Sequence, residues 1–276
     1  MKRFLLLSIA LVPAVFAVPL VYNNNAWYSG HDPSLVGKRE NFLIQGVSVD
    51  AIKDANGFTG AFQAILRFNY GGSTPAIGSL STISPYDFSS GGVVSSIQAS
   101  DLFFRQSGVL QYGIPLVDHG GNAVNGNSMG NGVFDDGDLY KIGSGVNVMT
   151  SNQFMRSGTD PANFGSGRSV RLTSDILNPQ ALQSGSTQIF FNGLCTESGC
   201  AVAEYTVTFN MLGAAGEGSD WRNFLMGISN GTITPYFTGS ACGNDLLDGA
   251  IPEPSTYLLL GGGLALMAIR ARRNKL

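Results

Sequence analysis

The sequence is short of charge, histidine and cysteine, and each shortage excludes a class of protein. Charged residues make up 13% of the chain, about half the share in an ordinary soluble domain. The two histidines and three cysteines leave few ligands for a zinc site. Between residues 18 and 251 there are 10 basic and 18 acidic side chains. An acidic body of this kind excludes a nucleic acid as the expected partner, because affinity for phosphates comes from basic patches.

The residues that are abundant point to a folded β protein. Apolar residues make up 43% of the chain, and 37 residues are glycine, so low charge does not indicate disorder here. Apolar and polar residues alternate over Phe62–Tyr70 and Tyr205–Met211, which is typical of half-buried antiparallel strands. The sequence predicts an all-β fold, an antiparallel β-sandwich for which a jelly roll is one arrangement. Further strands are expected at Phe42–Val49, Val93–Phe104, Val109–Ile114, Leu139–Ile142, Val146–Thr150, Ser169–Thr173, Gln188–Phe191 and Thr232–Phe237.

Turn and helix signals fill in the rest of the body. Asn-Gly pairs, which favour positive φ, occur five times, at positions 56, 125, 131, 192 and 230. One short helix is expected over Asp220–Gly227, with Asp220 as its N-cap.

The N-terminus has the three parts of a secretory signal peptide. Lys2 and Arg3 precede an apolar stretch that runs to Val18, and Val15 and Ala17 are small residues. This pattern predicts a signal peptide over residues 1–17, which signal peptidase cuts between Ala17 and Val18. It is too short for a stable membrane span.

The C-terminus repeats this composition in the opposite order. Pro252, Glu253 and Pro254 come first, and Pro252 and Pro254 disfavour helix before the apolar run at 257–269. The run has 13 residues, fewer than the roughly 20 of a full membrane helix, so flanking residues must complete the span. The basic tail that follows is expected to stay in the cytoplasm and to hold the body outside; its arginines are Arg270, Arg272 and Arg273.

This C-terminal arrangement resembles the PEP-CTERM sorting domain. The resemblance covers about 25 residues and rests on the Pro-Glu-Pro motif, the apolar helix and the arginine cluster in that order. It implies recognition by exosortase, a membrane enzyme that removes the helix, in exported proteins associated with exopolysaccharide and biofilm. It implies nothing about the fold or activity of the body. The expected domains are the signal peptide 1–17, a β-sandwich ectodomain 18–244, a linker 245–251 and the sorting signal 252–276.

The cysteines predict a disulfide, because the exported compartment is oxidising. Cys195 and Cys200 flank a short loop and are the favoured pair, worth about 2 kcal/mol of stability in the chain-entropy model. Cys242 with either partner is the alternative.

Three carboxylates fall within four residues, at Asp135, Asp136 and Asp138. Such a turn suits Ca²⁺, which takes oxygen ligands, although the spacing is not that of an EF-hand. A solvated turn is the simpler interpretation, and a structural calcium is the only cofactor considered.

Catalytic patterns are weak. Gly-x-Ser-x-Gly occurs around Ser128 and Ser229, but neither copy has the strand before and the helix after that a nucleophile elbow needs. His31 and His119 each have an aspartate as neighbour, which does not create a dyad, and both are expected to be ordinary surface or loop residues.

Aromatic residues in or near loops offer a sugar-binding platform as an alternative to core packing; they are Trp27, Tyr28, Tyr86, Phe88, Trp221 and Tyr236. The favoured function is a non-catalytic structural or adhesive protein of the cell surface or extracellular matrix, linked to exopolysaccharide or biofilm. The alternatives are a carbohydrate-binding module and a secreted glycan hydrolase that uses carboxylates such as Asp138, Glu197 or Glu204.

Overall fold

The structure is a computed structural model. It describes residues 19–23, 43–54, 57–70, 86–88, 92–94, 99–119, 134–150, 168–176, 178–194, 203–216, 218–239 and 245–249.

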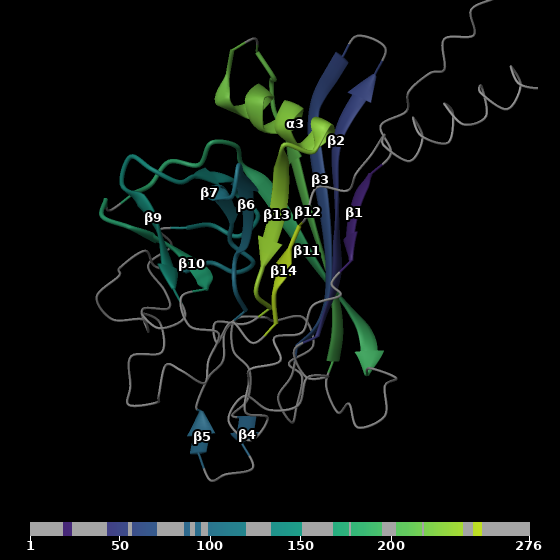
Figure 1. Ribbon diagram of the computed structural model, residues 1–276, viewed down its shortest axis with the longest axis vertical. Coiled ribbons are helices and arrows are strands. Elements are labelled where there is room, and N and C mark those ends of the chain that lie inside the picture. The colour runs from purple at the N-terminus through teal and green to yellow at the C-terminus, as the bar shows by residue number, and fades with distance from the viewer. Residues whose placement is uncertain are drawn as a thin grey trace, which may run out of the picture.

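Two antiparallel sheets of five strands each build the body (Figure 1). Sheet one has the order β1-β2-β3-β12-β11, with β1 Leu20–Asn23, β2 Ile44–Asp54, β3 Gly57–Tyr70, β12 Ala203–Leu212 and β11 Gly185–Leu194. Sheet two has the order β14-β13-β6-β7-β8, with β14 Leu247–Asp248, β13 Ile233–Phe237, β6 Leu102–Gln106, β7 Val109–Ile114 and β8 Tyr140–Lys141. Two smaller pairs are β9 Val146–Thr150 with β10 Ser169–Ser174, and β4 Tyr86–Phe88 with β5 Gly92–Val94.

The inner faces of the two sheets share one hydrophobic core. In sheet one, Leu66 lies opposite Val207 in the register of β3 and β12, and both are fully buried. Phe62 of β3 meets Phe104 of β6 with ring centroids 6.0 Å apart, and Phe68 meets Phe237 of β13 at 5.3 Å. These contacts across the sheets confirm the predicted antiparallel β-sandwich.

The middle of sheet two is buried on both of its faces, whereas Gln106, Val109 and Lys141 are exposed. Phe103, next to Phe104 in β6, points the other way and joins a second apolar cluster with Phe134 and Tyr140. The pair β9–β10 lies over this side and contributes Val146 and Leu172 to the cluster. All five residues of β13 are accordingly buried, so its sequence reads as a continuous run rather than as an alternation.

Helix α3, Asp220–Asn230, lies across one end of the sandwich, at the top of Figure 1. Its N-cap is Ser219, whose side chain accepts a hydrogen bond from the Arg222 N–H, so the prediction of Asp220 as the cap was wrong by one residue. The helix also continues beyond the predicted Gly227. It ends at Gly231, whose φ of 74° is the left-handed conformation that closes many helices.

Most predicted strands are confirmed, and Val109–Ile114 and Val146–Thr150 match to the residue. The single strand predicted over Val93–Phe104 is wrong, because β5 ends at Val94 and β6 begins at Leu102. Just before β6, the Asp101 N–H donates to the carbonyl of Val170 and its carboxylate accepts from the Leu172 N–H at 2.6 Å. These bonds turn Asp101 toward β10. The short strands β1 and β14 were not predicted.

Candidate functional site

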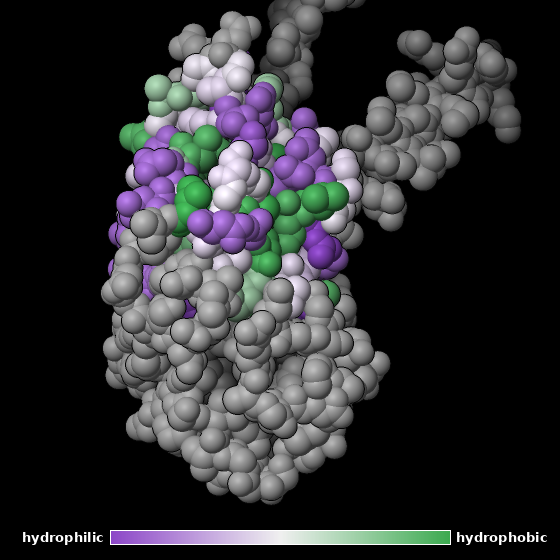
Figure 2. Space-filling view, turned by 90° about the vertical axis from the view of Figure 1, so that its left-hand side faces the viewer, coloured by the Kyte–Doolittle hydropathy of each residue, from purple (hydrophilic) through white to green (hydrophobic). Residues whose placement is uncertain are grey.

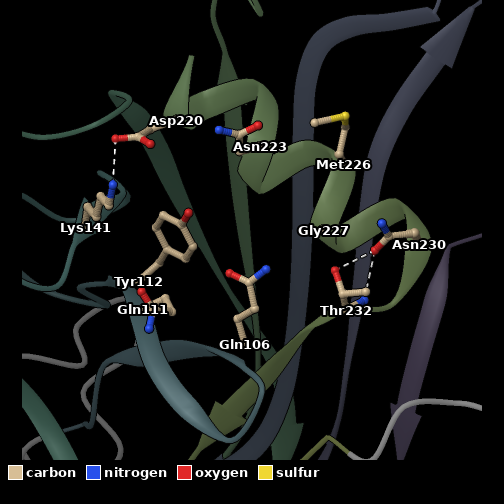
Figure 3. Close-up of a pocket in the computed structure, with 10 residues that line it drawn as sticks. All are labelled: Gln106, Gln111, Tyr112, Lys141, Asp220, Asn223, Met226, Gly227, Asn230 and Thr232. Atoms are coloured by element: carbon tan, nitrogen blue, oxygen red, sulfur yellow. Dashed lines mark hydrogen bonds and ion pairs between the residues drawn. The ribbon is translucent and has the colours of Figure 1, made fainter. Parts of the chain in front are cut away.

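A groove lies between helix α3 and the edge of sheet two formed by β6, β7 and β8. Its volume is about 420 Å³, within the range of small-molecule sites. Figure 3 shows Gln106 and Tyr112 pointing from the sheet toward the helix. The α3 groove is lined by Gln106, Gln111, Tyr112, Lys141, Asp220, Asn223, Met226, Gly227, Asn230 and Thr232.

The sequence of α3 explains why the helix presents polar groups to this groove. Its buried stripe follows helical spacing at Trp221, Phe224, Leu225 and Ile228. Phe224 holds this stripe in place, with ring centroids 5.1 Å from Phe62, 5.2 Å from Phe104 and 5.0 Å from Tyr112. The neighbouring stripe then faces the groove with Asn223, Met226 and Asn230.

Three amide side chains in the α3 groove are not used by the fold. Gln106, Gln111 and Asn223 make no side-chain hydrogen bond to any other residue that the structure describes. Asn230 differs, because its Oδ1 accepts from the backbone N–H and the hydroxyl of Thr232 at 3.0 and 2.7 Å. The groove therefore offers free donors and acceptors from both the sheet and the helix.

Charge in the groove is balanced by one ion pair. Lys141 Nζ lies 2.8 Å from Asp220 Oδ2, and the two side chains are 47% and 45% exposed. The hydrogen bond that Lys141 donates to Asp220 raises the pKa of Lys141. Burial raises the pKa of Tyr112, so its hydroxyl is protonated at neutral pH. The groove thus carries no net charge.

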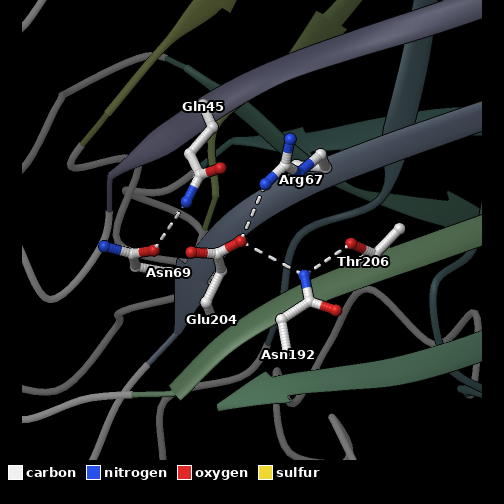
Figure 4. Close-up of polar contacts among 6 residues, drawn as sticks. All are labelled: Gln45, Arg67, Asn69, Asn192, Glu204 and Thr206. Carbon is white, nitrogen blue, oxygen red and sulfur yellow. Dashed lines mark hydrogen bonds and ion pairs between the residues drawn. The ribbon is translucent and has the colours of Figure 1, made fainter. Parts of the chain in front are cut away.

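The outer face of sheet one carries a second set of polar side chains, which we call the outer network: Gln45, Arg67, Asn69, Asn192, Glu204 and Thr206 (Figure 4). Arg67 Nη2 lies 2.9 Å from Glu204 Oε1, and Asn192 Nδ2 donates to Thr206 Oγ1 at 2.7 Å. Gln45 donates to Asn69 Oδ1 at 3.2 Å. In this network the side chains satisfy one another.

Glu204 is held ionised by the outer network. Burial by itself raises the pKa of this carboxyl, but the hydrogen bonds that it accepts from Arg67, Gln45 and Asn192 together lower the pKa by more. The net pKa therefore lies below the usual value. A glycosidase acid needs a raised pKa. Glu204 has the opposite shift.

The acidic turn predicted as a calcium site packs against the edge of sheet one. Asp138 Oδ1 accepts a hydrogen bond from the Gly185 N–H at 2.8 Å, at the start of edge strand β11. Burial and the charges of Asp118 and Asp135 raise the pKa of Asp136 and of Asp138. Within the described residues no three His, Cys, Asp or Glu side chains are grouped as metal ligands, and calcium at Asp135, Asp136 and Asp138 stays a prediction.

His119 is not the surface or loop residue that was expected. It is fully buried, and its Nε2 lies 3.0 Å from Oδ2 of Asp101 rather than near its neighbour Asp118. Its backbone pairs with Phe134, whose ring centroid lies 5.3 Å from that of the imidazole. Because the same Asp101 oxygen binds the Leu172 N–H, the pair joins three segments of the core.

The aromatic platform is wrong for two of its members. Trp221 and Tyr236 are only 3% and 2% exposed. Trp221 stacks on Phe224 inside the core, and Tyr236 lies under the Arg105 guanidinium at 4.1 Å from the ring centroid. Trp27 and Tyr28 lie outside the described residues, and the side chains of Tyr86 and Phe88 are not described.

The second Gly-x-Ser-x-Gly copy has no elbow geometry. Ser229 lies in the last turn of α3, and the strand β13 follows it instead of preceding it. The copy around Ser128 lies outside the described residues.

Several predicted features fall outside the described part of the chain. They are the signal peptide with its Ala17–Val18 cleavage site, Cys195 and Cys200, and the whole of the sorting signal with Pro252, Glu253, Pro254, Arg270, Arg272 and Arg273. Among the segments that are described, none forms a helix long and apolar enough to span a bilayer.

On the face that Figure 2 shows, the hydrophobic residues among the described ones lie in small patches between hydrophilic ones. The described part of this face therefore shows no broad apolar patch of the kind that marks many protein–protein interfaces.

Sequence reasoning missed the α3 groove entirely. The sequence of the helix shows the polar positions Asn223 and Asn230. Nothing in the sequence around Gln106 or Gln111 indicates that these two residues lie opposite the helix. Their meeting depends on Phe224 docking the helix on the end of the sandwich.

Comparison with known proteins identifies only the C-terminus. Residues 250–273 match the PEP-CTERM protein-sorting motif, which confirms the resemblance noted in the sequence. The motif implies export, anchoring in the membrane before cleavage, and processing by exosortase. No curated protein and no solved structure matches the chain.

Proposed function

We propose that the exosortase-sorted chain is a non-catalytic structural or adhesive protein of the cell surface or extracellular matrix, acting with exopolysaccharide or in a biofilm. The observation that carries this proposal is the sorting motif at residues 250–273. A protein anchored and then released by a sorting enzyme is delivered to the outside of the cell, where an adhesive β-sandwich has its use.

The arrangement of the carboxylates supports binding rather than hydrolysis. A glycosidase needs two carboxyl groups flanking the scissile bond, one of them with a raised pKa. Glu204 is tied to Arg67, and Asp220 is paired with Lys141 at the rim of the α3 groove. Asp138 does have a raised pKa, but its Oδ1 accepts the Gly185 N–H at the edge of sheet one. Each of these carboxylates already has a partner within the fold.

The sorting step is tested by changing Pro252, Glu253 and Pro254 together to alanine. We expect a protein that stays in the membrane and keeps its C-terminus, because exosortase no longer recognises it. Mass spectrometry of the cell fractions measures both properties. Glu217→Ala is the control, because it replaces a glutamate by alanine outside the motif. It should leave processing intact. Normal release and normal mass of the triple variant would disprove sorting.

The absence of catalysis is tested on the exported, processed protein. Incubation with neutral and acidic polysaccharides should release no new reducing ends and leave the chain-length distribution unchanged in size-exclusion chromatography. A shortening of any of these polysaccharides that depends on the protein would establish the hydrolase alternative.

A further inference from the structure

We propose that the α3 groove binds a neutral polyhydroxyl chain, such as a short stretch of an uncharged polysaccharide. This inference rests on the proposed function, because it names the ligand class that an adhesive ectodomain would hold.

The first support is the hydrogen-bonding chemistry of the unused side chains. A primary amide carries two donor hydrogens and one acceptor oxygen, and a sugar hydroxyl likewise donates and accepts. The side-chain amides of Gln106, Gln111 and Asn223 have no hydrogen-bonding partner among the described residues. An amide can therefore bind two neighbouring hydroxyls at once, and three amides on two sides of a groove can hold a chain between them.

The second support is the charge of the groove. Lys141 and Asp220 neutralise each other at 2.8 Å, so no unpaired cation is left to attract a uronate, a sulfate or a phosphate. An anionic ligand would have to break this ion pair and would meet an acidic body, with 18 acidic against 10 basic side chains. A neutral ligand meets neither obstacle.

The third support is the shape and the apolar part of the lining. Asn223 and Asn230 are seven residues apart, so the helical side of the groove extends over about 10 Å. Met226, which lines the groove, is 38% exposed. Its thioether carbons can contact the C–H face of a sugar, while the amides bind its hydroxyls.

A peptide fits this lining less well. Peptide recognition depends on a few large apolar anchors in deep pockets. The groove is lined instead by exposed polar side chains, and its largest ring, Tyr112, is 5% exposed.

The test uses the exported, processed protein and isothermal titration calorimetry with named probes. The neutral probes are cello-oligosaccharides, dextran and mannan; the others are polygalacturonate, which is acidic, and an uncharged unstructured peptide. We expect binding to at least one neutral probe and to neither of the others. Gln106→Ala and Asn223→Ala should each weaken that binding about two- to twelve-fold, which corresponds to one hydrogen bond.

Gln188→Ala is the matched control. Gln188 is an exposed amide on β11, in sheet one, and its removal should leave the affinity unchanged. Circular dichroism of all three variants separates a lost contact from a lost fold. Binding that falls equally in the control, or binding only to polygalacturonate or the peptide, overturns the proposal, as does binding to no probe.

Failure of this inference can be told apart from failure of the proposed function. If the protein is processed and reaches the surface but binds none of the neutral probes, the ligand class is wrong and the proposed function stands. If the protein is never processed by exosortase, the proposed function itself fails.

Discussion

The outer network and the α3 groove are both rich in side-chain amides, but the fold uses the two sets differently. On sheet one, Asn192 bonds to Glu204 and Thr206, and Gln63 bonds to Asn210 at 2.8 Å. In the groove, the side-chain amides of Gln106 and Asn223 have no hydrogen-bonding partner among the described residues. Paired amides stabilise a fold, whereas unpaired amides around a concave surface remain available to a ligand. Hydrogen-bond use, more than composition, therefore distinguishes a structural surface from a binding surface.

The largest effect is expected from removing the buried ring that holds α3 on the sandwich. Phe224→Ala should lower the free energy of unfolding by about 3–5 kcal/mol, because it deletes a fully buried ring that packs on Phe62, Phe104 and Tyr112. Urea denaturation measures the loss. Met226→Ala, an exposed position on the same helix, should change stability by less than about 0.5 kcal/mol. Equal losses would mean that α3 is not held by its buried stripe.

A smaller effect is expected within the paired amides. Gln63→Ala removes the donor to Asn210 Oδ1 and should cost about 0.5–1.5 kcal/mol of folding free energy. A double-mutant cycle with Asn210→Ala isolates the pair, and the double variant should lose less stability than the sum of the two single losses. Strictly additive losses would show that the two amides do not depend on each other.

The ion pair between Arg67 and Glu204 should contribute less than about 1 kcal/mol to the free energy of unfolding, because the Arg67 side chain is 56% exposed. The folded-state pKa of Glu204 lies below its usual 4.5, so its contribution to stability is present above that pH and is lost as the pH falls through the lowered pKa. Arg67→Ala should therefore destabilise the protein at pH 7 and have a smaller effect near pH 3. Thermal unfolding at the two pH values measures the difference. A loss of equal size at both would assign Arg67 a packing role instead.

The smallest effect on stability is expected in the groove itself. Gln106→Ala should change the free energy of unfolding by less than about 0.5 kcal/mol, since its amide bonds to nothing else that is described. Measuring Gln106→Ala and Gln63→Ala under the same conditions tests directly whether groove amides stabilise the fold less than the paired amides of sheet one. A cost as large as that of Gln63→Ala would show that the groove amide also supports the fold.

Strands could be predicted from sequence wherever the alternation was local. Val109–Ile114 and Val146–Thr150 were predicted to the residue. Val93–Phe104 failed because Asp101 is fixed by residues far along the chain, Val170 and Leu172. β14 is only two residues long and forms by pairing with β13, so its own sequence carries no strand signal.

The Asn-Gly pairs show the same division on a smaller scale. The sequence predicted positive φ, and Gly193 and Gly231 have φ of 111° and 74°. It did not predict that the first would sit at a bulge in β11 and the second would end α3. The dipeptide sets the local conformation, and the surrounding elements decide what that conformation is used for.

By itself, the sequence determined the β character of the body, the helix near residue 220 and the sorting signal at residues 250–273, because each depends on residues that are close together in the chain. Only the tertiary structure decided that His119 would be buried against Asp101, that Trp221 would be core, and that Gln106 and Asn223 would face one groove. These outcomes depend on how the two sheets and α3 pack together. Gln106 and Asn223 are more than a hundred positions apart in the chain, and no local sequence pattern predicts that they meet.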